Sequence, residues 1–288
     1  MAQTDYPSRL AAPLPPSVIA AYESDGATVV RGVVPPVWIE RMRQAIDRVL
    51  AKPGRAAVEY TPKDRPGRYY GDFFVWQRDP DFRAFMADSP LPHLAAEIMG
   101  SREVRFFYDQ LLVKEPNTAE ATPWHQDLPY WPLRGSQILS LWVPFDRATL
   151  ETGVVVYVKG SHRWGKMFAP AAFGKDSGFA DVFRKMNMEP VPDIEAERDQ
   201  YDILTWEVEP GDLIVHHPLA LHYASGNASP TARRRGLALR YVGDDARWDD
   251  RPGTFLQHPR MQALLPDLKQ TAGRPLAGDF FPRVWPRD

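Results

Sequence analysis

The stretch ILTWEVEPGDLIVHH, residues 203–217, contains two short runs rich in β-favouring residues, separated by Pro210 and Gly211. Pro and Gly are typical turn residues, so the two runs are predicted to be strands. Four further runs have the same character: VRFFYDQLLVKE (104–115), ILSLWVPF (138–145), GVVVYVKG (153–160) and RGLALRYVG (235–243). Several short strands divided by turn residues predict a β-sandwich or barrel rather than a parallel βαβ array.

Helices are predicted mainly before this β-rich part. Apolar residues recur at helical spacing within 37–51, and shorter helices are predicted over 17–24, 80–87 and 91–99. Two more strands are expected within 27–34 and 69–77. We therefore expect one domain over residues 1–288, organised as a helical N-terminal support (1–102), a core of about 103–245, an insertion (161–201, with a helix near 178–187) and a tail (246–288).

The composition excludes several classes of function. Lys and Arg total 35 against 37 Asp and Glu, a net charge of −2, which argues against nucleic acid or an acidic membrane as partner. There is no Cys, so disulfides and thiolate metal sites are excluded, and a metal must be held by carboxylates and the seven His. No apolar run approaches the ~20 residues of a membrane span, and the N-terminus has no secretory signal pattern. A cytoplasmic location is predicted.

The segment PWHQDLPYWP, residues 123–132, offers a candidate metal motif. His125 and Asp127 are two residues apart, so in an extended chain both side chains lie on one face. An imidazole and a carboxylate on one face can fill adjacent positions around a metal. A second His would complete the two-His-one-carboxylate set of non-haem Fe(II) oxygenases, which leaves positions open for cosubstrate and oxygen.

The same motif, taken with Trp142, GSH at 160–162, PGDLIVHHPLALHYASGN at 210–227 and the arginines at 233–235, resembles the phytanoyl-CoA dioxygenase family. The resemblance runs from about residue 103 to 245. It implies a mainly β fold with flanking helices, a double-stranded β-helix (jelly roll, cupin-like). It also implies an enzyme that uses Fe(II), 2-oxoglutarate and O2, with His125, Asp127 and His222 as iron ligands. His216 and His217 are the alternatives for the third ligand, with His216 ahead of His217.

The resemblance further implies an Arg for the distal carboxylate of 2-oxoglutarate, about eleven or twelve residues after the second His. A guanidinium suits this task because its planar fork bonds a carboxylate in a bidentate way. Strand alternation favours Arg234 over Arg233, because Arg234 shares a face with small residues that leave room for a ligand. Other cosubstrate candidates are Trp142, Lys114 and Gln110. Position 224 is Ala, where the family often has Ser, so one cosubstrate contact is expected to differ.

The predicted substrate is a small organic molecule, with succinate and CO2 as co-products. Its expected contacts are Tyr70, Phe73, Tyr130, Trp131 and Arg163. Related halogenases have Gly or Ala at the carboxylate position, so Asp127 predicts hydroxylation, or a desaturation or demethylation that begins with it. Two alternatives stay open, namely a cupin-like metal enzyme that does not use 2-oxoglutarate and a non-catalytic small-molecule binder. The oligomeric state is open.

Overall fold

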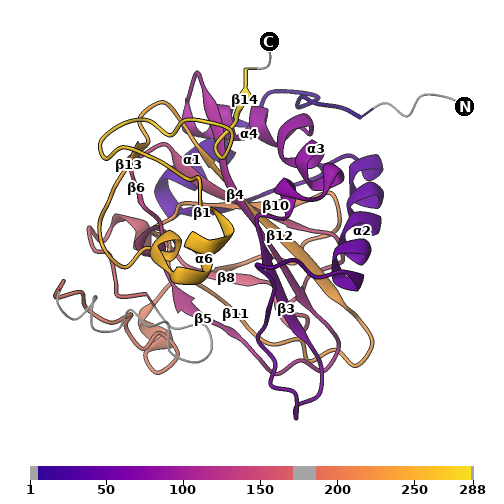
Figure 1. Ribbon diagram of the computed structural model, residues 1–288. Coiled ribbons are helices and arrows are strands. Elements are labelled where there is room, and N and C mark those ends of the chain that lie inside the picture. The colour runs from indigo at the N-terminus through magenta and orange to yellow at the C-terminus, as the bar shows by residue number, and fades with distance from the viewer. Residues whose placement is uncertain (1–5, 171–185, 287–288) are drawn as a thin grey trace, which may run out of the picture.

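A computed structural model describes residues 6–170 and 186–286, and in it two antiparallel sheets face each other (Figure 1). In spatial order, the larger sheet contains β1 (Ala27–Val30), β10 (Leu213–His216), β7 (Ile138–Pro144), β12 (Arg234–Val242), β4 (Val104–Lys114), β3 (Tyr69–Phe73) and β2 (Val58–Glu59). The smaller sheet contains β5 (Thr122–His125), β11 (His222–Ala224), β8 (Val155–Val158) and β9 (Ile203–Thr205). The six predicted runs all contain strands, so the predicted β-sandwich is confirmed.

Helices cover the outer face of the larger sheet (Figure 1). They are α1 (Pro16–Asp25), α2 (Pro36–Ala51), α3 (Pro80–Asp88) and α4 (Leu91–Met99), close to the predicted ranges. The predicted apolar stripe of α2 is buried, including Trp38, Met42 and Ile46. These side chains pack in one core cluster with outward-facing strand residues such as Leu237 and Leu239. The apolar stripe thus fixes the helix against the sheet and leaves the inner face of the sheet for the second layer.

Strand β12 shows how the two faces differ. Leu237, Leu239 and Tyr241 point into the helix-side core, whereas Ala238 lies in the core cluster between the two sheets. Arg234 and Arg240 share the inner face with Ala238 and line a cavity there. Alternation along one strand therefore places two arginines between the sheets, separated by small residues.

The sheet extends beyond the expected core of 103–245 at both ends of the chain. Strand β1 pairs with β10, β3 pairs with β4, and β14 (Arg283–Trp285) from the tail also pairs with β4. The N-terminal part is therefore more than a helical support, because it supplies strands as well. Most of the helix predicted near 178–187 lies outside the described residues.

Two predicted strands end earlier than expected. The strand predicted over 27–34 is β1, which stops at Val30 because Gly32 adopts a left-handed conformation (φ 60°). The strand predicted over 69–77 divides into β3 and a 3-10 helix, η1 (Val75–Gln77), with the left-handed Phe74 (φ 55°) between them.

Asp212 stabilises the turn after β1. Its carboxylate accepts hydrogen bonds from the backbone N–H of Gly32 (2.9 Å) and Glu209 (3.1 Å) and from the Arg31 guanidinium (2.7 Å). We expect Asp212→Ala to lower the free energy of unfolding by about 1–3 kcal/mol, because three donors, one of them a charged guanidinium, lose their acceptor.

Burial alone would raise the pKa of Asp212, but these hydrogen bonds and the Arg31 charge lower it. The stabilisation that the ionised carboxylate gives to the fold is therefore lost as pH falls through that pKa. Urea unfolding curves of the parent protein and of Asp212→Ala measure the difference in the free energy of unfolding. Asp199→Ala, at an exposed position, is the control. Superimposable curves for Asp212→Ala and the parent would contradict the prediction.

Candidate metal centre

Three buried residues with metal-ligating side chains converge between the two sheets: His125, Asp127 and His222. His125 ends β5, Asp127 follows it by two residues, and His222 begins β11. His222 and His125 are directly paired across the β11–β5 ladder, which brings together residues far apart in the chain. The three donor atoms lie within 4.8 Å of one another. This is the juxtaposition expected from the sequence.

Both imidazoles present the same nitrogen to the centre of the cluster. The Nδ1 atom of His125 lies 2.8 Å from the Pro123 carbonyl, and that of His222 lies 2.9 Å from the Ala220 carbonyl. A carbonyl only accepts, so each Nδ1 carries the proton and each Nε2 keeps its lone pair. The Nε2 atoms lie 3.7 Å and 3.9 Å from Oδ1 of Asp127. Two nitrogen donors and one oxygen donor therefore face one point, which fits a divalent metal.

The electrostatics keep the cluster in its metal-binding protonation state. Burial alone would raise the pKa of Asp127, but Arg240 and the nearby imidazoles hold it well below its ordinary value. Burial and the neighbouring imidazoles lower the pKa of His222 well below its ordinary value. An ionised carboxylate beside a neutral imidazole is the state in which both bind a metal.

His216, the alternative third ligand, lies beside the cluster but its nitrogens face other groups. Its Nε2 atom is 3.3 Å from Oδ2 of Asp127, and its Nδ1 atom is 3.0 Å from the hydroxyl of Tyr157. Both nitrogens are thus engaged away from the point that the other three donors share. The geometry favours His222 over His216 as the third donor.

Of the three arginines at 233–235, Arg234 is the one that lines the cavity at the cluster. It is 2% exposed, its guanidinium donates to the Leu112 carbonyl (3.0 Å), and it lies 5.6 Å from the ring of Trp142. Its buried Nε has no hydrogen-bond partner within the described residues. By contrast, Arg233 faces outward, where it pairs with Glu115 and Asp47.

The other cosubstrate candidates surround Arg234. Trp142 and Gln110 line the same cavity as the two histidines. Lys114 is fully buried, with Nζ 3.3 Å from the Ala224 carbonyl and 4.5 Å from the ring centre of Tyr69. Burial and the nearby Arg234 lower the pKa of Lys114 well below its ordinary value.

Several residues that line the cavity were not chosen as cosubstrate candidates, among them Arg240 and Tyr69. Arg240 lines the cavity, and it shares a face with Arg234 by simple alternation. Tyr69 lines the cavity as well, whereas the neighbouring Tyr70 does not. The Tyr70 hydroxyl donates to Asp72 (2.8 Å), and its ring packs in the helix-side core.

The remaining substrate candidates lie at different distances from the cluster. The ring of Tyr130 is 6.0 Å from that of His125. Trp131 is buried, with its ring 5.8 Å from the Arg240 guanidinium. Arg163 is exposed on η3 (Ser161–Arg163). Of the five candidates, Tyr130 and Trp131 are the ones that the structure brings beside the cluster or its immediate neighbours.

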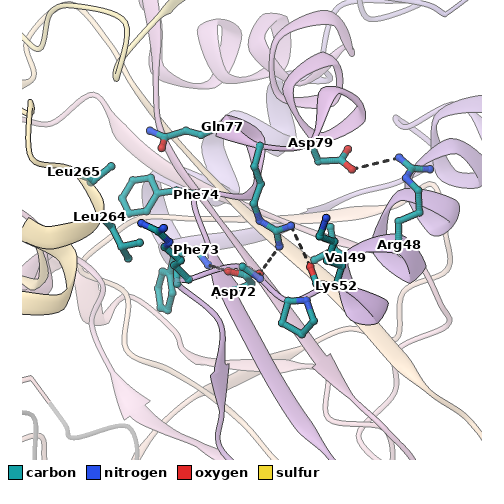
Figure 2. A pocket seen from close by; sticks show the side chains of 15 residues that line it. Arg48, Val49, Lys52, Asp72, Phe73, Phe74, Gln77, Asp79, Leu264 and Leu265 are labelled. Atoms are coloured by element: carbon teal, nitrogen blue, oxygen red, sulfur yellow. Dashed lines mark hydrogen bonds and ion pairs between the residues drawn. The ribbon is translucent and has the colours of Figure 1, made fainter.

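A larger cavity lies elsewhere, near the end of α2 and α6 (Pro259–Leu264) (Figure 2). It has a volume of about 620 Å³, and it is lined on one side by apolar residues that include Phe73. Basic residues line the other side, but the Arg78 guanidinium already bonds Asp72 (2.6 Å). None of the three clustered ligand residues lines this cavity. The smaller cavity is therefore the candidate site.

The two facing antiparallel sheets are those of a jelly roll, and they enclose a two-His-one-carboxylate cluster. The protein is therefore a jelly-roll protein with a candidate metal centre. Residues 22–236 match the family model "Phytanoyl-CoA dioxygenase (PhyH)", and the chain belongs to this family. The match covers most of the chain. The family and the jelly-roll fold expected from the sequence are thereby confirmed.

Individual relatives agree with this assignment. The chain is 24% identical over 252 residues to the human peroxisomal phytanoyl-CoA dioxygenase, covering 81% of this chain and 70% of the relative. It is 24% identical over 242 residues to the multifunctional dioxygenase prhA of Penicillium brasilianum, covering 80% and 73%. Both relatives carry dioxygenase names.

Solved structures share the fold. The nogalamycin-biosynthesis carbocyclase SnoK has a TM-score of 0.71 at 23% identity, covering 94% of this chain and 96% of that chain. The epimerase SnoN, in complex with Fe3+, alpha ketoglutarate and nogalamycin RO, has a TM-score of 0.68 at 22% identity, covering 93% and 97%. EctD from S. alaskensis, with 2-oxoglutarate and 5-hydroxyectoine, has a TM-score of 0.68 at 20% identity, covering 89% of each chain. Among the described residues, no helix has the length and apolar character needed to span a bilayer.

Proposed function

We propose that this protein is an Fe(II)- and 2-oxoglutarate-dependent dioxygenase that oxidises a small organic molecule, with His125, Asp127 and His222 as the iron ligands. One observation carries the proposal. The two histidines of the buried cluster, His125 and His222, line a single cavity together with the buried Arg234, whose Nε lacks a partner among the described residues. A metal would bind the clustered donors, and a dicarboxylate bound to that metal would supply a partner for the Arg234 guanidinium.

The residues around Arg234 fit the distal end of the cosubstrate. Arg234 would bind the distal carboxylate of 2-oxoglutarate, because its unused Nε–H points to a charge-assisted partner. Trp142 would form one wall and Lys114 would add a nearby donor. Gln110, whose Oε1 accepts from Arg240 (3.0 Å), would form the opposite wall. Together these groups would hold the cosubstrate beside the metal, against the inner face of β12.

When bound, Fe(II), 2-oxoglutarate and O2 supply an oxidative decarboxylation to succinate and CO2, coupled to oxidation of the substrate. The chain's own task is to orient the reactants and to exclude water from the cavity. With Asp127 in the cluster, hydroxylation is the proposed outcome. Tyr130 and Trp131, which lie nearest to the cluster, are the proposed substrate contacts. The organisation as one domain and a cytoplasmic location remain predictions of the sequence.

An anaerobic titration tests this function against its two alternatives. Fe(II) followed by 2-oxoglutarate is expected to produce the visible charge-transfer absorption of a chelate, and succinate release on exposure to air completes the assay. A protein that binds Fe(II) but gives no such band with 2-oxoglutarate would be a cupin-like metal enzyme. A protein that binds neither would be a small-molecule binder on the same fold.

A further inference from the structure

The two carboxylate oxygens of Asp127 have different surroundings. Oδ1 faces the Nε2 atoms of the two histidine donors. Oδ2 faces the larger sheet, where it accepts a hydrogen bond from the Ser140 hydroxyl (2.9 Å). His216 Nε2 lies 3.3 Å from the same oxygen, and the Arg240 guanidinium lies 3.8 Å away. One oxygen is therefore available to a metal, and the other is surrounded by donors.

The three groups around Oδ2 form one row across the larger sheet. Ser140 on β7 is paired with His216 on β10, and Arg240 on β12 is paired with Ser140 on the other side. All three are almost fully buried. The smaller sheet thus supplies the two histidine donors, and the facing row of the larger sheet contacts the carboxylate from behind.

The direction of the hydrogen bonds follows from the chemistry of the partners. An ionised carboxylate only accepts, so Nε2 of His216 carries the proton that points at Oδ2. Its Nδ1 is then unprotonated and accepts from the Tyr157 hydroxyl at 3.0 Å. Tyr157 is fully buried on β8, and it is the cross-strand neighbour of His222. A chain of donors therefore runs from Tyr157 through His216 to Asp127.

We propose that His216, oriented by Tyr157, is a positioning residue that limits Asp127 to ligation through one oxygen. Ser140 and His216 both contact Oδ2 as hydrogen-bond donors, and Arg240 adds a favourable charge on the same side. The carboxylate then cannot rotate to offer both oxygens to a metal. This inference rests on the proposed function, because it matters only if Asp127 is a ligand.

Single-oxygen ligation keeps the site open for chemistry. Three protein donor atoms leave three positions of an octahedral metal free, as a cosubstrate with two donor atoms and O2 together require. A carboxylate that bound through both oxygens would occupy one of these positions. Loss of the His216 contact should therefore weaken cosubstrate binding. It should weaken metal binding as well, because the carboxylate loses a partner that orients it.

Two variants test the role of His216 without relying on turnover. His216→Leu removes the donor to Oδ2, and Tyr157→Phe removes only the hydroxyl that orients His216. We expect His216→Leu to weaken Co(II) binding to the apoprotein by about 10–100-fold, as is typical when an outer partner of a metal ligand is lost. Tyr157→Phe should weaken it less, and both should raise the Kd of 2-oxoglutarate in anaerobic Fe(II) titrations.

Matched controls separate positioning from a general effect on folding. Tyr241→Phe removes another buried hydroxyl, one that donates to the Met86 carbonyl in the helix-side core (2.9 Å), and should leave both affinities unchanged. His216→Gln retains an N–H donor and should recover part of the affinity lost in His216→Leu. If His216→Leu does not fold, Tyr157→Phe decides the question alone.

The outcomes distinguish this inference from the function on which it rests. Parental Co(II) and 2-oxoglutarate affinities in His216→Leu and Tyr157→Phe, with loss in Asp127→Ala, would overturn the role of His216 and leave the metal centre intact. Parental Co(II) affinity in Asp127→Ala would instead overturn the metal centre itself.

Discussion

Asp127→Ala is expected to abolish succinate formation and to remove high-affinity Fe(II) binding. Asp127 supplies the only negative charge among the three clustered donors, so its loss leaves two neutral imidazoles to hold a dication. His125→Ala and His222→Ala should abolish activity too, because each leaves a single imidazole with the carboxylate. Succinate release and metal content after reconstitution measure both effects.

The expected loss of succinate formation must come from damage to the metal site and not from unfolding of the protein. The three variants should keep the circular dichroism spectrum and a cooperative unfolding transition, since each removes a side chain from the cluster between the sheets and none from the apolar core. His216→Ala is the informative comparison, because it should weaken the site without abolishing it. Full activity in His222→Ala, with loss in His216→Ala, would show that the third ligand is His216.

Arg234→Ala is expected to raise the KM for 2-oxoglutarate by at least about ten-fold. A charge-assisted hydrogen bond to a carboxylate contributes about 1.5–3 kcal/mol, which corresponds to a change of that order or larger. Arg234→Lys should be nearly as damaging, because an ammonium does not reproduce the bidentate fork. Steady-state kinetics with 2-oxoglutarate as the varied substrate measure both variants.

Arg233→Ala provides the control one residue away. Its guanidinium pairs with Glu115 and Asp47 at the surface, and exposed ion pairs contribute little. The KM for 2-oxoglutarate should therefore stay within about two-fold of the parent. An unchanged KM in Arg234→Ala together with a raised KM in Arg233→Ala would reverse the assignment.

The inner face of β12 could be predicted from the sequence because its pattern is local. Bulky Leu237, Leu239 and Tyr241 alternate with Arg234 and Ala238, and alternation alone assigns the arginine to the less crowded face. The structure agrees, since Arg234 lines the cavity. His125 and Asp127 were likewise found by local spacing, helped by the resemblance of the wider segment to a known family.

Other parts of the site depend on pairing between distant segments. Strands β5 and β11 have four and three residues, too short for a period to be recognised. Tyr69 and Tyr70 are equivalent in the sequence, and only the pairing of Tyr69 with Lys114 decides which of them faces the cavity. The row behind Asp127 depends in the same way on the register of three strands.

The cross-strand pairing of His125 with His222 also bears on how the protein matures. Strand β5 lies at the edge of the smaller sheet, and β11 is its neighbour there. The donors meet only after β11 has docked on β5, so the complete site does not exist in the unfolded chain. Iron loading of the proposed site would therefore follow the pairing of β5 with β11, and the bound ion would cross-link two segments between which the chain forms strands β6 to β10. Emptying the site releases that cross-link, which makes the sheet edge at β5 the first place where the iron-free protein is expected to open.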